Sequence, residues 1–324
     1  MITLWYALVV LCWVLYFVLD GFDFGVGLLA SLVGRDDRER GAAVSTVGPF
    51  WDGNEVWLVA AIGATFAAFP GWYAALLSAL YLPLVAILLL LAVRGVALEF
   101  RGKHDGTRWR RGWEVALAAS SAGTVALWGA VLATMVRGLA LGADGSVAGN
   151  GLARSVAPML TVESAVGAMV ALCAAALLGA TFLSLRTSGP VRERARRVAL
   201  WTSFAAAVLS VPSVLIGGLG WVAAVVCLVV GVLAWARREA LAFGTVAAGV
   251  AAAVVAVFTA HPDVVLRSTL HPAWSLTMSN AAAGDSALRL ITTVGVVVLP
   301  GVLAYQAFSY WVFRRRVASG RIPS

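Results

Sequence analysis

The chain is a succession of long apolar blocks separated by short polar connections. Most blocks reach roughly the 20 residues that an α-helix needs to cross the hydrocarbon core of a bilayer. The pattern therefore predicts an all-α, polytopic membrane protein with about nine transmembrane helices packed in bundles. We expect these spans near residues 4–33, 47–69, 72–100, 113–136, 160–185, 198–217, 219–236, 240–260 and 287–313.

The sixth and seventh predicted spans meet at the glycine-rich sequence Gly217-Gly218-Leu219-Gly220. Such a sequence is compatible with a tight outer hairpin or with a kink in one long segment. Because the combined length is too great for a single crossing, we expect the hairpin.

Composition supports the membrane assignment. Of the 324 residues, 61% are hydrophobic and only 12% are charged, against roughly 45–50% and 25% in soluble domains. No connection is long enough to form a separate soluble domain, so residues 1–324 are expected to form a single transmembrane domain. The first apolar block lacks a basic leader and a cleavage site, and we expect it to be retained.

The positions of the basic residues predict the orientation of the chain. A net charge of +8 by itself suggests a nucleic-acid partner, but alternate connections collect most of the arginines on one side. By the positive-inside rule this side is cytoplasmic, which places the N-terminus outside and the C-terminus inside, with no nucleic acid as partner. Contact of these loops with anionic lipid heads is compatible with the same arrangement.

Four acids lie inside the first two predicted spans, where an ionisable group costs about 2.5–3.5 kcal/mol. Asp20 and Asp23 are three residues apart, which places them on one face of a helix, and Asp52 and Glu55 repeat that spacing. In the predicted orientation all four fall in the cytoplasmic half of the membrane. We predict that they form a proton path from the cytoplasm. The alternative is that they are buried hydrogen-bond and ion-pair partners that fix helix register.

The third predicted span ends with Arg94 and Glu99, which we interpret as a structural ion pair or as residues that fix register. Trp51 and Trp57 flank the acidic pair of the second span. They are candidates to face a cofactor, although packing in the core explains them equally well.

Metal ligands and self-contained catalytic motifs are missing from the spans. Haem iron usually takes histidine, methionine or cysteine as axial ligand, and His104, His261 and His271 all lie in predicted connections. We therefore predict no metal site, and we interpret His261 as a helix cap or interface residue. The sequence contains no phosphate-binding loop, no H-E-x-x-H and no nucleophile with an adjacent base, so no self-contained active site is expected.

Six stretches of the sequence resemble subunit II of the cytochrome bd-type quinol oxidases. They are residues 19–27 (LDGFDFGVG), 48–58 (GPFWDGNEVWL), 66–70 (FAAFP), 94–101 (RGVALEFR), 275–281 (SLTMSNA) and 300–306 (PGVLAYQ). The resemblance follows the whole chain in order. One departure lies at the start of the fifth predicted helix, where Glu163 stands in a stretch in which family members commonly carry an Asn-Pro motif.

The resemblance implies a bacterial cell-membrane subunit that forms a heterodimer with a larger subunit I, which holds two b-type haems and haem d. Such a complex oxidises quinol at the outer side and reduces dioxygen to water with cytoplasmic protons, as a terminal oxidase of the respiratory chain. In the family, the acids matching Asp20, Asp23 and Asp52 are associated with a proton path towards the oxygen-reducing haem. Some members also hold a structural quinone on subunit II, and small accessory subunits are further expected partners.

Two other interpretations of the same carboxylates stay open at this point. A proton-coupled secondary transporter would use them for coupling, and paired discontinuous helices in two repeated halves would favour it; we find no convincing repeat of this kind. A purely structural subunit would need the acids only for assembly.

Overall fold

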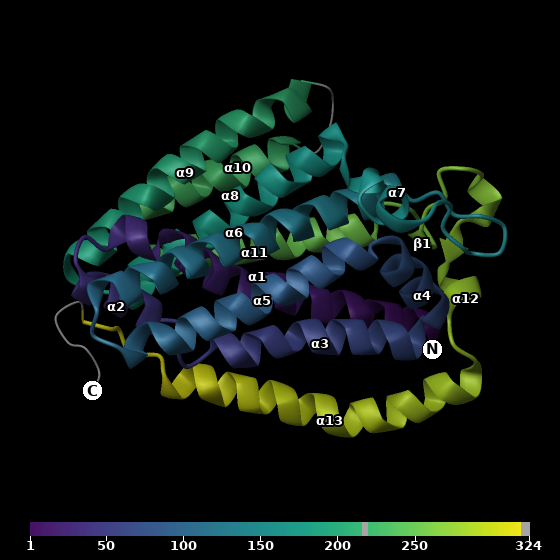
Figure 1. The fold of residues 1–324 in the computed structure, drawn as a ribbon, viewed down its shortest axis with the longest axis horizontal. Coiled ribbons are helices and arrows are strands. Elements are labelled where there is room, and N and C mark those ends of the chain that lie inside the picture. The colour runs from purple at the N-terminus through teal and green to yellow at the C-terminus, as the bar shows by residue number, and fades with distance from the viewer. Residues whose placement is uncertain (216–219, 319–324) are drawn as a thin grey trace.

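The computed structural model describes residues 1–215 and 220–318, and these form an elongated bundle of long helices with a cap of loops at one end (Figure 1). The long helices are α1 (Ile2–Val33), α3 (Trp51–Ala68), α5 (Tyr81–Phe100), α6 (Thr107–Arg137), α8 (Val162–Arg186), α9 (Gly189–Leu215), α10 (Gly220–Trp235), α11 (Glu239–Phe258) and α13 (Asp285–Val312). The short elements are α2 (Asp37–Ser45), α4 (Pro70–Ala79), η1 (Arg101–Lys103), α7 (Gly151–Ser155), η2 (Ala157–Met159), β1 (Val264–Leu266), η3 (Pro272–Trp274), β2 (Leu276–Thr277) and α12 (Met278–Ala281).

The chain is mostly helical, as predicted, and six of its described helices are long and apolar enough to cross a membrane. These six are α1, α5 with its η1 extension, α6, α8, α11 and α13. The helices α3, α9 and α10 also overlap predicted spans, but α10 has only 16 residues. The predicted hairpin at Gly217-Gly218-Leu219-Gly220 centres on residues 216–219, which lie outside the described part of the chain.

The third predicted span is not continuous. Residues 72–100 fall in two helices, α4 and α5, which are separated at Leu80 with φ −107° and ψ 30°. The physical reason lies in Pro83, which has no N–H to donate to the carbonyl of Ala79 and so interrupts the hydrogen-bond ladder. Proline is tolerated in the first turn of a new helix, which is where α5 places it.

Two long connections form the cap at one end of the bundle. The second connection contains the pair of strands β1 and β2, and it meets the first through a bridge between Leu139 and Ser268, where the Leu139 N–H donates to the Arg267 carbonyl. The start of α1 lies at this end, and α13 ends at the opposite end near α2 (Figure 1). The two long predicted outer connections, residues 137–159 and 261–286, therefore lie together, away from the arginine-rich connections.

The interior of the bundle depends on close approach of α8 to α1. A Cβ placed on Gly25 would lie 2.0 Å from the Ala175 carbonyl oxygen and 2.6 Å from the backbone nitrogen of Gly179. One turn away, the rings of Phe22 and Phe182 stack with centroids 4.1 Å apart. The absence of a side chain at Gly25 and Gly179 is therefore what lets the two backbones touch.

Helix α13 stands apart from the rest of the bundle. It runs along α3 at the edge of the molecule (Figure 1), and only 6% of its apolar window is buried within the chain. Its principal polar attachment to the bundle is in the site described next.

Candidate functional site

A buried charged cluster joins α1, α3 and α5 within the bundle. Arg94 of α5 is fully buried, and its Nη2 lies 2.6 Å from Asp20 Oδ1 and 3.8 Å from Asp23 Oδ2. Its Nη1 lies 3.6 Å from Glu55 Oε2. The guanidinium also stacks over the ring of Phe24 at 4.2 Å, a cation–π contact. Three acids predicted from the sequence therefore meet one guanidinium.

The charges of this cluster do not balance. Asp20 and Arg94 are 0% exposed and Asp23 is 2% exposed, whereas the Glu55 side chain is 28% exposed. If all three carboxylates were ionised, the group would carry two uncompensated negative charges in a low-dielectric interior, which is costly. The cluster is therefore suited to hold at least one proton, and Asp20 Oδ2 and Asp23 Oδ1 have no hydrogen-bond partner among the described residues.

Asn54 ties this cluster to α13, a role that sequence reasoning missed. Its Nδ2 donates to Asp23 Oδ2 at 2.8 Å, and its Oδ1 accepts from Gln306 Nε2 at 2.9 Å and from the Tyr310 hydroxyl at 2.8 Å. The signal was present, because Gln306 and Tyr310 are four residues apart and share a helix face. Nothing in the sequence, however, paired that face with Asn54.

Two predicted residues lie outside the cluster. Asp52 is exposed in the first turn of α3, where the free backbone N–H groups favour a carboxylate. Glu99 is also exposed, and Arg94 forms its close ion pair with Asp20 instead of with Glu99. The reason is geometric, since five residues correspond to about 140° around a helix and turn Glu99 away from the face of Arg94.

The two tryptophans beside the acids pack within the chain. Trp57 is buried in the hydrophobic core. Trp51 is half-buried, with its ring 3.4 Å from the position that a Cβ on Gly95 would occupy. The ring of Trp51 thus lies against α5, and Gly95 provides the room for it.

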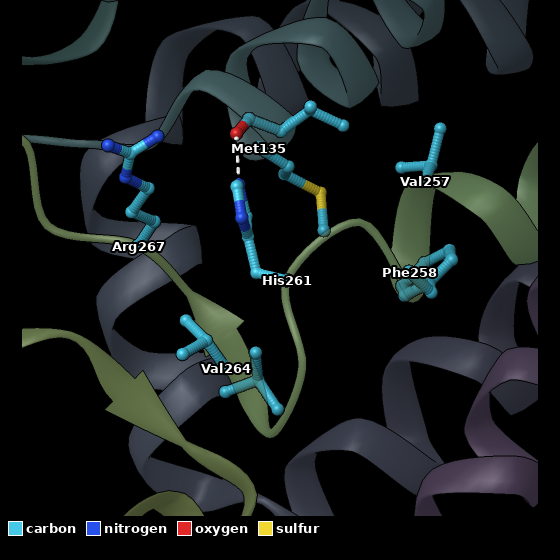
Figure 2. Close-up of a pocket in the computed structure, with 8 residues that line it drawn as sticks. Met135, Val257, Phe258, His261, Val264 and Arg267 are labelled. Atoms are coloured by element: carbon cyan, nitrogen blue, oxygen red, sulfur yellow. Dashed lines mark hydrogen bonds between the residues drawn. The ribbon is translucent and has the colours of Figure 1, made fainter. Parts of the chain in front are cut away.

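The histidines stand at the ends of the bundle. His261 Nε2 lies 2.9 Å from the Val136 carbonyl oxygen, and Figure 2 shows the ring pointing at the last turn of α6. Because a carbonyl only accepts, Nε2 carries the proton and satisfies one of the orphan carbonyls at that helix end. His271 accepts from the Ala273 N–H, and His104 accepts from the Gly106 N–H.

None of these imidazoles is placed to ligate a haem in the interior of the chain, since each is engaged locally at a helix end or in a loop. In the part of the chain that the structure describes, no group of three or more histidine, cysteine, aspartate or glutamate side chains is arranged to hold a metal ion.

A second charged network links the helices at the arginine-rich end. Glu114 is buried and accepts from Arg101 at 2.7 Å and from Arg40 at 3.2 Å. Asp37 pairs with both Arg101 and Arg110. This network joins α2 to the turn between α5 and α6. Several of the arginines that mark the predicted inner side form ion pairs in it.

Comparison with known proteins identifies the family. Residues 1–313 match the family described as cytochrome bd terminal oxidase subunit II. This chain belongs to that family. Cytochrome bd ubiquinol oxidase subunit 2 of Bacillus subtilis is 36% identical over 97% of this chain and 96% of the relative. Cytochrome bd-I ubiquinol oxidase subunit 2 of Escherichia coli K12 is 29% identical over 97% of this chain and 94% of the relative.

The fold agrees with this assignment. A chain of the bd oxidase from Geobacillus thermodenitrificans superimposes with a TM-score of 0.68 at 16% sequence identity, over 96% of this chain and 98% of that one. The predicted resemblance to cytochrome bd subunit II is thus confirmed, and the secondary transporter is not supported. The chain is a subunit of a terminal oxidase and a multi-pass bacterial membrane protein.

Proposed function

We propose that this cytochrome bd subunit II pairs with a haem-bearing subunit I in a quinol oxidase and supplies it with cytoplasmic protons. The relatives in B. subtilis and E. coli are named ubiquinol oxidase subunits and match this chain over nearly its whole length. Subunit I would hold two haems b and haem d, which transfer electrons from quinol and reduce dioxygen. The groups of this chain would act on protons.

The proposed topology has about nine spans, with the N-terminus outside. In this arrangement α4 and α5 share one span, and α3, α9 and α10 also cross the bilayer. The arginine-rich ends of the described helices lie together at the end where α13 terminates, whereas the cap of β1 and β2 lies at the other end (Figure 1). That segregation of charge supports a cytoplasmic assignment for the first of these ends.

The proton path would run inwards along a gradient of exposure. Asp52 is exposed at the start of α3, Glu55 is partly exposed one turn further in, and Asp23 and Asp20 are buried. At 1.5 Å per residue, Glu55 stands about 6 Å along α3 from its first residue. A proton would bind the Asp52 carboxylate, transfer to Glu55 directly or through water, and reach the Asp20–Asp23 pair.

The observation that carries the proposal is the excess of carboxylates around Arg94. A single fixed positive charge keeps part of the cluster ionised, whereas the additional acids have no counter-charge and gain or lose a proton at low electrostatic cost. A purely structural pair would need one acid only.

The test compares Asp23→Asn and Asp52→Asn in the assembled oxidase. We expect both to lower quinol-dependent oxygen consumption per haem and to change its pH profile, because the path then lacks a titratable group. Glu99→Gln is the matched control, since it removes an exposed acid from the neighbouring helix and should leave both readouts unchanged. Variants that assemble in smaller amounts, yet keep wild-type activity per haem and its pH profile, would show that the acids serve structure alone.

A further inference from the structure

The strongest unexplained feature is the complete saturation of the buried Asn54 amide. Besides Asp23, its Nδ2 contacts the Leu19 carbonyl oxygen at 3.3 Å, and its Oδ1 receives two donors from α13. Asn54 is 0% exposed. A buried side chain that uses both ends of its amide in this way has one orientation only.

The chemistry of the partners fixes that orientation. The Leu19 carbonyl can only accept, so the NH2 group of Asn54 must face α1, and its oxygen must face α13. Gln306 and Tyr310 must then act as donors towards this oxygen. Asn54 therefore presents a donor to Asp23 Oδ2 as long as α13 holds its other end.

This arrangement makes the two oxygens of Asp23 different. Oδ2 accepts from Asn54, whereas Oδ1 is buried without a hydrogen-bond partner among the described residues. We propose that Asn54, clamped by Gln306 and Tyr310, is a positioning residue that directs proton binding on Asp23 to Oδ1. The inference rests on the proposed proton path and names the group that orients one of its acids.

The charged and titratable groups around Asp23 agree with this assignment. Asp20 of α1, Glu55 of α3 and Arg94 of α5 surround it, and Tyr310 of α13 reaches it through Asn54. A proton on Oδ1 leaves the Asn54 bond intact, because Oδ2 still accepts. The acid can therefore change its protonation state without rotation of the carboxyl group or movement of α13.

The hydrogen bonds from Gln306 and Tyr310 to Asn54 are called the clamp below. The one from Tyr310 can be removed with little change in packing. Its ring stacks on Phe50 with centroids 4.5 Å apart and an interplanar angle of 12°. Tyr310→Phe keeps this stack and deletes only the hydroxyl that donates to Asn54. The matched control is Tyr305→Phe, which deletes a hydroxyl from an exposed side chain of the same helix.

The experiment uses the assembled oxidase with Tyr310→Phe, with the double variant Tyr310→Phe/Gln306→Leu, and with Tyr305→Phe. The readouts are the pH profile of quinol-dependent oxygen consumption and the infrared carbonyl band of protonated Asp23, assigned by its loss in Asp23→Asn. We expect the double variant to move the profile to higher pH by about 0.5–1 unit, because Asn54, released from α13, no longer holds its donor on Asp23 and the hydrogen bond that favours the ionised carboxylate is weakened. The band should shift in both clamp variants and stay unchanged in Tyr305→Phe.

The outcomes distinguish failure of the proton path through Asp23 from failure of the positioning role of Asn54. If Asp23→Asn itself leaves the pH profile unchanged, the proton path through Asp23 is wrong. If Asp23→Asn changes the profile while the clamp variants keep the wild-type profile and carbonyl band, the path stands and the positioning role of Asn54 is overturned. Should the double variant fail to assemble, the carbonyl band of Tyr310→Phe decides, since its packing is preserved.

Discussion

Arg94 is the residue on which the buried cluster depends. It is the counter-charge for Asp20 and lies within 4 Å of Asp23 and Glu55. Removing one member of a buried ion pair leaves an uncompensated charge in the interior, which is more damaging than the loss of the pair itself.

We therefore expect Arg94→Leu to destabilise the subunit by about 3–5 kcal/mol. Arg108→Leu is the matched control, because Arg108 is exposed at the start of α6 and its loss should cost at most about 0.5 kcal/mol. Thermal unfolding of the detergent-solubilised complex, together with its yield from membranes, measures both. Equal unfolding temperatures for the two variants would contradict a dominant role for Arg94.

Glu39 provides a pH-dependent contact at the arginine-rich end. Partial burial by itself raises the pKa of Glu39, but hydrogen bonds from the Arg35 N–H and from Arg194 outweigh it and hold the pKa below its usual value. An acid of this kind stabilises the fold above its unfolded pKa, near roughly 4.3. The contribution is lost as the pH falls through the lower, folded value.

Glu39→Gln should accordingly lower stability by about 0.2–1 kcal/mol at neutral pH, and by nothing once the pH is below the folded pKa. Unfolding curves at several pH values, combined with Arg194→Gln in a double-mutant cycle, isolate the contact. If Glu39→Gln is less stable than the parent chain by the same amount at acidic pH, the charge of the Glu39 carboxylate is not the source of the stabilisation.

At the level of the elements, the packing of α1 on α8 places Asp20 and Asp23 inside the bundle. Gly25 and Gly179 meet backbone to backbone, so any side chain at either position must push the helices apart. We expect Gly25→Ala to cost about 1–3 kcal/mol or more, as overpacking against backbone cannot be relieved by a rotamer change.

Gly63→Ala is the control for this substitution, because a Cβ at Gly63 of α3 meets no atom within 4 Å. There the higher helix propensity of alanine should stabilise by about 0.5–1 kcal/mol. Unfolding temperature and the amount of subunit in the membrane report both changes. The explanation by close packing fails if the two alanine variants behave alike.

On the scale of the whole molecule, the distribution of charge predicts which end faces the cytoplasm. We expect Asp144→Cys, in the cap, to react with a membrane-impermeant maleimide on intact spheroplasts. His104→Cys, in the turn between α5 and α6, should react only after permeabilisation; both positions are exposed. The parent chain, with its native cysteines, gives the background, and the reverse labelling pattern would invert the proposed topology.

The sequence by itself determined the membrane class, the positions of most long helices and the family. These depend on local properties, namely apolar runs of sufficient length and the composition of short stretches such as residues 19–27 and 48–58. It also identified Asp20, Asp23, Glu55 and Arg94 as exceptional, because an ionisable group within an apolar run is conspicuous wherever the run packs.

Only the tertiary structure decided which of these residues meet. Glu55 joins Arg94 whereas Asp52 and Glu99 stay exposed, and Asn54 bridges α1 and α13 although Gln306 lies 252 residues further along the chain. Sequence spacing fixes the relative directions of side chains on one helix, but contacts between helices depend on how their faces are rotated towards each other. That rotation is set by packing such as the Gly25–Gly179 contact, and neither helix alone specifies which partner it meets.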